Sequence, residues 1–259
     1  MSVGIVGNGV VGTAIAQQVD AAVSLFDPRE TWEDGHDAYI IAVPTPAHFG
    51  GSLNMSYVEE ALKRIPRDVP VLIKSTITVD FAIYLKCHRD TVCFSPEFLT
   101  ERNSIEDARN ESKFIVGGQD KYNKYWSRLF IKHIVLENDG RVHECDIVEA
   151  AVLKLAENSF FAIKVSFANE IYDLTERLGV NFDNVIEGLK LDPRLGESHW
   201  QVPGHDGQRG WGGKCLPKDS QALATAGRKR GEPFHTLEAA IEKNHTYRDD
   251  IAVDDLSMM

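Results

Sequence analysis

Three glycines near the N-terminus constrain the fold more than any other feature of the sequence. Gly7, Gly9 and Gly12 end the apolar run SVGIV and open the segment VVGTAIAQQV, whose apolar residues recur at helical spacing. A G-x-G-x-x-G pattern between a strand and a helix permits a tight turn and close packing of the helix on the strand. The pattern therefore predicts that the chain begins with the strand, turn and helix of a parallel sheet.

Strand-like and helix-like segments alternate over the first 140 residues. Apolar runs predict further strands at 21–27, 37–46, 69–76, 91–95, 113–118 and 133–137. Helical spacing predicts helices at 55–65, 78–87 and 121–130. This alternation predicts an α/β fold class, with an N-terminal Rossmann-like, doubly wound parallel sheet that has helices on both faces.

The pattern changes near residue 140, where we place a boundary between a domain of residues 1–140 and an all-helical domain of residues 141–259. One helical stretch without Gly or Pro runs from Glu144 to Leu178. Its segment FFAIKVSFANEI is apolar on nearly all sides, which predicts burial, with a second subunit as one candidate for the covering surface. A shorter helix, a loop rich in Gly and Pro from Asp192 to Cys215, and two final helices complete the prediction.

Composition excludes several classes of function. Lys and Arg number 28 against 39 Asp and Glu, a net charge of −11, which argues against a nucleic-acid-binding protein. None of the four cysteines forms a C-x-x-C pair, so neither a zinc or other metal site nor a redox dithiol is expected. Few cysteines, no long apolar run and no signal peptide predict a cytoplasmic protein that does not enter the membrane.

The glycine pattern and an acidic residue together predict a dinucleotide site. Gly7 would allow the turn, Gly9 the approach of a pyrophosphate, and Gly12 the packing of the helix. Asp27 lies twenty residues after Gly7, at the end of the second predicted strand. Its carboxylate would bind an adenosine ribose and repel a 2′-phosphate, which favours NAD over NADP, although Arg29 is a counter-signal. The alternative is a glycine turn that binds nothing.

Cys215 lies in GWGGKCLPKD, an unusual setting for a packing cysteine. Pro217 can occupy the first turn of a helix, which would place Cys215 at a helix N-terminus, with Lys214 and Lys218 nearby. These features favour a thiolate nucleophile. From the residues alone, a catalytic and a structural role for Cys215 are equally supported. The other three cysteines are expected to be small buried hydrophobes: Cys87, Cys93 and Cys145.

Polar residues in apolar or strand-end contexts are further candidates. Lys154 and Asn158 share a face of the long predicted helix and could stabilise an oxyanion, or Lys154 could make a surface ion pair with a nearby glutamate. Glu97 and Glu101 follow a strand end, where one carboxylate could act as a general base, or both could be solvated loop acids. Thr76 ends another predicted strand on the same edge.

These residues together resemble the UDP-glucose/GDP-mannose dehydrogenase family over nearly the whole chain. The resemblance rests on Asn244 in a late helix and on seven segments, in chain order: GIVGNGVVG, VPTP, KST, SPEFLTE, KLAENSFFAIKVSFANE, DPRLG and GWGGKCLPKD. It implies oxidation of a sugar C6 alcohol to a carboxylate, with four electrons passing to two NAD⁺. UDP-glucose is the leading substrate. GDP-mannose, a UDP-N-acetylhexosamine and a smaller sugar phosphate are the alternatives.

The resemblance also implies a role for each matching residue. Cys215 would form a thiohemiacetal and then a thioester, Lys154 and Asn158 would stabilise the oxyanion, and Glu101 would be the base for hydrolysis. Thr76 and Asp219 would hold the water or the sugar oxygen, and Glu97 would support the site. The implied cofactor contacts are Gly7, Gly9, Val10, Val11, Gly12, Asp27, Thr45, Thr76 and Glu101. The implied substrate contacts are Glu97, Phe98, Leu99, Lys154, Asn158, Arg194, Gly212 and Cys215.

The resemblance implies a homodimer through the helix at 146–178, with Arg194 reaching the substrate of the partner. Three features of the sequence depart from the usual pattern of the family. The family's C-terminal nucleotide-sugar-binding domain has no counterpart in the sequence, Arg102 replaces a usual glycine, and the loop at 199–209 is longer than expected. That loop or a partner chain could supply the missing contacts. A two-electron hydroxyacid-type dehydrogenase and a non-catalytic NAD-binding partner protein are the competing functions.

Overall fold

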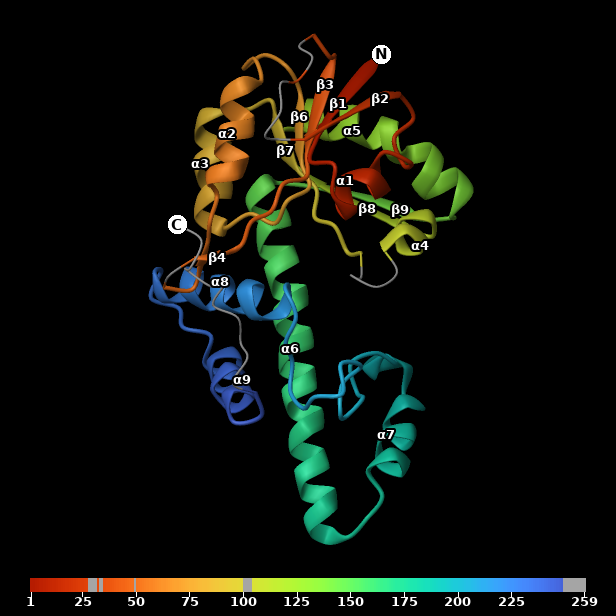
Figure 1. The fold of residues 1–259 in the computed structure, drawn as a ribbon, viewed down its shortest axis with the longest axis vertical. Coiled ribbons are helices and arrows are strands. Elements are labelled where there is room, and N and C mark those ends of the chain that lie inside the picture. The colour runs from red at the N-terminus through yellow and green to blue at the C-terminus, as the bar shows by residue number, and fades with distance from the viewer. Residues whose placement is uncertain (28–31, 33–34, 49, 100–103, 249–259) are drawn as a thin grey trace. The chain divides into compact units, whose positions relative to one another are not determined.

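The computed structural model describes residues 1–27, 32, 35–48, 50–99 and 104–248. The chain divides into two compact units (Figure 1). The first unit contains residues 1–46 and 53–154, and the second contains residues 47–52 and those from 155 onward.

The first unit is built on a seven-stranded sheet with the order β2-β1-β3-β6-β7-β8-β9. In that order the strands are Ala22–Phe26, Ser2–Val6, Ala38–Ile41, Val71–Ile73, Val92–Phe94, Lys113–Gly117 and Arg141–Cys145. Neighbouring strands are parallel except β7 and β8, which are antiparallel. The predicted α/β class with a Rossmann-like parallel sheet is therefore confirmed, with one antiparallel pairing that the sequence pattern did not indicate.

Helices cover both faces of this sheet (Figure 1). Residues along each strand alternate between two cores: Leu72 of β6 packs on the side of Trp126, while Val71 and Ile73 pack on the side of Phe81. The first core face is covered by α1 (Val10–Ile15) and α5 (Asp120–Ile131), and the second by α2 (Ser56–Arg64) and α3 (Val79–His88). Burial on both faces explains why the strands read as continuous apolar runs rather than as alternating ones.

The glycine loop, Gly7–Gly12, lies where the strand order reverses. β1 pairs with β2 on one side and with β3 on the other, and the Gly7 amide donates to the Phe26 carbonyl at 2.9 Å. Gly7 has a φ of +116°, and a Cβ on Gly12 would lie 1.8 Å from the Gly7 carbonyl oxygen. Only glycine can therefore occupy position 12 while α1 packs this closely on the loop.

One predicted strand and the predicted start of the long helix are wrong. Residues 133–137, predicted as a strand, lie in a π-helical turn, η1 (Lys132–Glu137), which continues α5. The apolar, β-branched residues of this run suggested a strand, but Ile134 packs into the same core as α5. The outermost strand is instead β9, which contains Glu144, so α6 (Ile147–Leu178) begins later than predicted.

Besides β9, four short elements of the described residues are absent from the prediction: α4 (Ser104–Arg109), β4 (Ala47–His48), β5 (Ser52–Leu53) and the 3₁₀-helix η2 (Pro193–Leu195). The β4 and β5 strands form a separate two-stranded sheet. Each of these elements is too short to produce a clear periodic pattern.

The second unit is mainly helical. Besides β4 and the first residue of β5, its described part contains α6 from Leu155 onward, α7 (Phe182–Lys190), the 3₁₀-helix η2 (Pro193–Leu195), α8 (Leu216–Arg228) and α9 (His235–His245). Ala168 of α6 and Phe182 of α7 pack with Trp200 of the following loop in a small core. None of the helices in the described ranges combines the length and apolar character needed to cross a bilayer.

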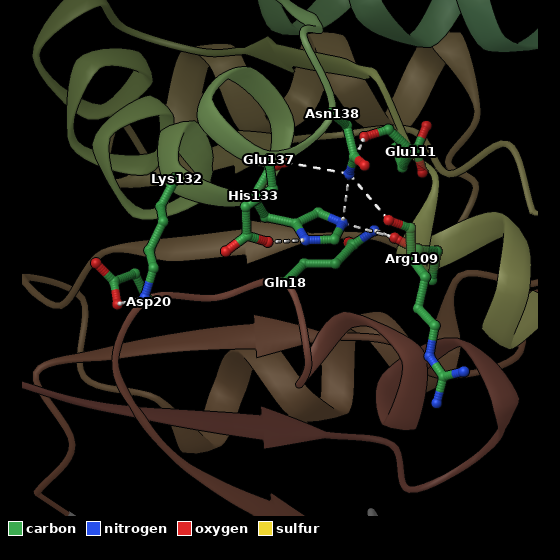
Figure 2. A network of polar contacts seen from close by, with 9 residues as sticks. Gln18, Asp20, Arg109, Glu111, Lys132, His133, Glu137 and Asn138 are labelled. Carbon is green, nitrogen blue, oxygen red and sulfur yellow. Dashed lines mark hydrogen bonds and ion pairs between the residues drawn. The ribbon is translucent and has the colours of Figure 1, made fainter.

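A polar network holds the end of α4 in the first unit (Figure 2). The Ala108 carbonyl accepts hydrogen bonds from Gln18 Nε2 at 2.8 Å and His133 Nε2 at 2.7 Å. Asn138 Nδ2 lies 2.9 Å from the Arg109 carbonyl oxygen and 3.2 Å from that of Glu111. The contacts to Ala108 and Arg109 satisfy carbonyls that the last turn of a helix leaves without partners, and the contact to Glu111 holds the segment that follows α4.

We expect Asn138→Ala to lower the free energy of unfolding by about 1–3 kcal/mol, because the Arg109 and Glu111 carbonyl oxygens would lose a hydrogen-bond donor. Chemical denaturation monitored by circular dichroism would measure the change. Lys132→Ala is the control. Its ion pair with Asp20, 3.6 Å long, is more than half exposed on both sides, so its loss should change stability by less than about 0.5 kcal/mol. Equal effects of the two substitutions would contradict this account of the network.

Candidate active site

The glycine loop of the first unit fits the pyrophosphate of a dinucleotide. Gly9 is the N-cap of α1, its carbonyl accepts a hydrogen bond from the Thr13 amide, and no side chain in the described part of the chain caps this end. Among the described residues, nothing lies within 4 Å of the position that a Cβ on Gly9 would take. Backbone amides at the start of the helix can therefore receive an anion at close range. Val10 is exposed at this end, and Val11 is partly buried.

Other predicted cofactor contacts lie at the carboxyl edge of the same sheet. Asp27 follows β2 directly and is partly buried, Thr45 is buried after β3, and Thr76 is partly buried after β6. The Ser75 hydroxyl donates to the Val43 carbonyl at 2.7 Å, which joins the segments after β6 and β3. The structure thus brings these predicted residues to one edge of the sheet, the edge where such folds bind ligands. Glu101 lies outside the described residues.

The β7 loop, Ser95–Leu99, holds three of the predicted substrate contacts. Glu97 Oε2 accepts a hydrogen bond from the Leu99 amide at 2.8 Å. Lys154 Nζ donates to the Glu97 carbonyl oxygen at 2.7 Å and lies 5.0 Å from the centre of the Phe98 ring. Because Lys154 is only 5% exposed, a surface ion pair is excluded, and the lysine is part of a buried cluster with this loop.

Lys74 was not predicted as a site residue, although it lies in the KST segment. It is buried, and its Nζ donates to Ser95 Oγ at 3.1 Å. The sequence does contain a signal that could have identified Lys74, because the lysine directly follows the apolar run VPVLI. A lysine at the end of a buried strand is seldom fully buried unless it has a partner.

In the second unit, Cys215 is the N-cap of α8 and is exposed. Pro217 lies in the first turn of α8, as predicted, and the Asp219 amide donates to the Cys215 carbonyl at 3.0 Å. The amides and the dipole at this end of the helix favour a negatively charged sulfur. Lys218, predicted to lie near the thiol, pairs with the Asp219 carboxylate, with Nζ 2.6 Å from Oδ1.

Asp219 is a completely buried carboxylate at the start of α8. Its Oδ2 accepts a hydrogen bond from Asn158 Nδ2 at 2.5 Å, and its Oδ1 faces Lys218. Burial of a carboxylate is unfavourable unless a cation and hydrogen-bond donors compensate for lost hydration, and both are present here. Two predicted site residues, Asn158 and Asp219, are therefore directly joined.

The cysteine loop, Gly210–Cys215, is fixed by contacts that the sequence analysis did not identify. Asn244 of α9 accepts from the Trp211 amide at 2.8 Å and donates to the Trp211 carbonyl oxygen at 2.8 Å. The Trp211 indole donates to Ser166 Oγ at 2.9 Å. A Cβ on Gly212 would lie 2.6 Å from the Arg248 guanidinium, so the loop is packed closely against that side chain. Asn244 was part of the family resemblance, but no role was predicted for it.

Arg194 lies in η2 and its side chain is 86% exposed. Its Nε lies 2.9 Å from Asp192 Oδ1 and 3.0 Å from Asp192 Oδ2, so one N–H group is shared between both carboxylate oxygens. Hydrogen bonds from Arg194 lower the pKa of the Asp192 carboxyl. The structure places this predicted substrate contact on the surface of the second unit, beside a carboxylate of its own chain.

Family models match most of the chain. Residues 20–134 match the NAD binding domain of the UDP-glucose/GDP-mannose dehydrogenase family, and residues 148–246 match the central domain of that family. The chain belongs to the UDP-glucose/GDP-mannose dehydrogenase family. The resemblance found in the sequence is therefore confirmed, and the match to the NAD binding domain confirms NAD as the cofactor of the first unit.

Individual relatives agree with this placement. The UDP-glucose 6-dehydrogenase of Rickettsia felis is 30% identical over 218 residues, covering 80% of this chain and 47% of the relative. A UDP-glucose dehydrogenase structure from Pyrobaculum islandicum matches with a TM-score of 0.74 and 24% identity, covering 95% of this chain and 68% of that one. The chain spans about half the length of the curated relatives it matches.

The same fold occurs in a second class of dehydrogenase. A 3-hydroxyisobutyrate dehydrogenase from Mycobacterium tuberculosis matches with a TM-score of 0.75 and 15% identity, covering 97% of this chain and 94% of that one. At this identity the likeness concerns the fold alone, so the choice of chemistry depends on the residues of the site.

Two glycine substitutions should separate cofactor binding from folding. Gly9→Ala places a methyl group where a pyrophosphate would approach, so we expect roughly tenfold weaker NAD⁺ binding with little change in stability. Gly12→Ala forces a methyl group onto the Gly7 carbonyl and should lower the free energy of unfolding by about 2 kcal/mol or more. Calorimetric titration and denaturation would measure the two effects. Unchanged NAD⁺ affinity in a stable Gly9→Ala protein would contradict the assignment.

Proposed function

We propose that the chain acts as an NAD-dependent nucleotide-sugar 6-dehydrogenase, with UDP-glucose as the leading substrate. The proposal rests on the exposed Cys215 at the start of α8, one turn before the buried Asp219. A two-electron alcohol dehydrogenase has no use for a thiol in this position, whereas oxidation of an alcohol to a carboxylate can use a covalent intermediate. The family match across both units supports the same conclusion.

Cys215 would act as the nucleophile. The glycine loop would hold NAD⁺, which would supply the hydride acceptor for each of two successive oxidations at the sugar C6, with one NAD⁺ used per oxidation. Between these two events the Cys215 thiolate would add to the C6 aldehyde, and the carbonyl oxygen would take up the negative charge of a thiohemiacetal. The second oxidation would convert the thiohemiacetal into a thioester between C6 and the Cys215 sulfur. Attack by water on that carbon would release the carboxylate and return the thiol.

The surrounding residues would stabilise charge and direct the water. Lys154 and Asn158, one turn apart on α6, would donate to the C6 oxygen when it is negatively charged. Asp219 and Thr76 would hold the attacking water or the sugar oxygen, Glu97 would support the site, and Glu101 would accept the proton of the water. Because Asp219 already orients the Asn158 amide, this donor would need no rearrangement during the reaction.

The amount of NADH formed per sugar tests the four-electron route. With limiting UDP-glucose and excess NAD⁺, we expect two NADH per sugar from the wild type. GDP-mannose and UDP-N-acetylhexosamines would be tested in the same way. Cys215→Ser should slow formation of the carboxylate by roughly a hundredfold or more, because the hydroxyl is a much weaker nucleophile. Absorbance of NADH would follow the reaction, and mass spectrometry would identify the product.

Cys87→Ser is the matched control, because Cys87 is also exposed but lies in α3 of the first unit. It should retain both the rate and the amount of NADH. One NADH per molecule of an alcohol substrate, unchanged in Cys215→Ala, would instead favour a two-electron hydroxyacid-type dehydrogenase. NAD⁺ binding without turnover of any sugar nucleotide would favour a non-catalytic partner protein.

We further propose a homodimer through α6. Four exposed residues form an apolar stripe at seven- and four-residue spacing along this helix: Phe160, Phe167, Leu174 and Leu178, which are 53–64% exposed. Large apolar side chains in such a row are typical of a surface that another chain covers. A second copy would cover the stripe by packing its own α6 against it, and the exposed Arg194 would then reach the substrate of the partner.

Phe167→Asp should shift the protein toward a monomer, because a carboxylate at the centre of the stripe would lose hydration in the dimer. Light scattering coupled to gel filtration would report the mass across a range of protein concentrations. Glu176→Lys is the control, because Glu176 is exposed on α6 and lies off the stripe. A Phe167→Asp protein with the same mass as the wild type at every concentration would rule out this interface.

A further inference from the structure

Lys74 is a buried cation to which the mechanism above gives no role. It directly follows β6 and is 5% exposed. Its Nζ donates to Ser95 Oγ at 3.1 Å and lies 3.3 Å from the Pro96 carbonyl oxygen. Because an ammonium group is unfavourable in the interior unless hydrogen bonds replace its hydration, these two contacts are strong constraints on the position of the loop.

The loop that Lys74 holds is the β7 loop of the candidate site. Lys74 binds its first two residues, and Lys154 Nζ binds the Glu97 carbonyl oxygen at 2.7 Å. The Leu99 amide closes the loop by donating to the Glu97 carboxylate. Two buried ammonium groups, one directly after β6 and one on α6, thus hold neighbouring peptide groups of one short loop, and the one on α6 is the proposed oxyanion donor.

Charge also couples Lys74 to this cluster. Burial lowers the pKa of Lys74, while attraction to Glu111 and Glu97 acts in the opposite direction and repulsion from Lys154 lowers the pKa further. Burial raises the pKa of Glu111, and Lys74 and Lys113 oppose that rise. Removal of the Lys74 charge would therefore leave the two carboxylates with less compensation and would change the electrostatic surroundings of Lys154.

We propose that Lys74 is a positioning residue that sets the place of the β7 loop, and through it the place of Lys154 and Glu97. This inference rests on the proposed function, in which Lys154 donates to the C6 oxygen and Glu97 supports the site. Lys74 itself does not touch the substrate. Its contacts are with Ser95 and Pro96, so its effect on the reaction passes through the loop.

Two measurements on Lys74→Met test the inference. Hydrogen exchange without substrate, followed by NMR or mass spectrometry, should show faster exchange at the Leu99 amide, because the loop loses one of its two anchors. Steady-state kinetics should show kcat lowered about tenfold to a hundredfold with an unchanged KM for NAD⁺, because a small displacement of a catalytic donor affects the transition state and leaves the glycine loop intact.

Two further variants separate positioning from a general loss of stability. Lys74→Arg keeps the charge and the donors and should recover part of both kcat and exchange protection. Lys86→Met removes a lysine of α3 that is 57% exposed and should behave as wild type. If Lys74→Met does not fold, Ser95→Ala removes one acceptor of the Lys74 ammonium and should produce smaller changes in the same direction.

The outcomes distinguish this inference from the proposed function. If the wild type turns over no sugar nucleotide, the proposed function is wrong. Hydrogen exchange at the Leu99 amide then remains as the test of whether Lys74 holds the loop. Unchanged exchange at Leu99 in folded Lys74→Met overturns the inference in either case. A Lys74→Met protein with wild-type kcat but lowered stability also overturns the inference, because Lys74 would then contribute to stability only.

Discussion

The contact between Gly12 and the Gly7 carbonyl is the constraint on which the first unit depends. It allows α1 to pack closely enough for Ile15 to enter the core with β1. β1 is then free to pair with β2 on one side and β3 on the other, which places the segments after these strands at one edge. The position of Asp27 and Thr45 therefore follows from a local backbone requirement near the N-terminus.

A buried carboxylate has a comparable role in the second unit. Asp219 has no exposed surface, so its charge must be compensated by Lys218 and Asn158. The Asp219 amide also bonds to the Cys215 carbonyl, which fixes the first turn of α8. The same residue thus orients a donor on α6 and anchors the helix that begins at Cys215. Asn244 completes this arrangement by holding the backbone of Trp211.

The sequence predicted those parts of the structure that depend on local pattern. The sheet, most helices and the position of Cys215 at a helix start follow from periodicity, glycine spacing and Pro217. The strand predicted at 133–137 failed because tertiary packing of Ile134 in the α5 core outweighs a weak strand preference. The burial of Lys74 and its bond to the β7 loop could not be predicted, because they depend on which strands become neighbours in the sheet.

Position in the fold, more than residue type, distinguishes Cys215 from the other three cysteines. Burial, with a smaller effect of nearby acids, raises the pKa of Cys93 to about 12 and that of Cys145 to about 11, so both remain thiols at neutral pH. Cys87, which was expected to be buried, is exposed like Cys215, but it lies in the last turn of α3, at the opposite end of a helix. Cys215 combines exposure with the amino end of a helix. It is therefore the cysteine whose surroundings favour both access by a substrate and a charged sulfur.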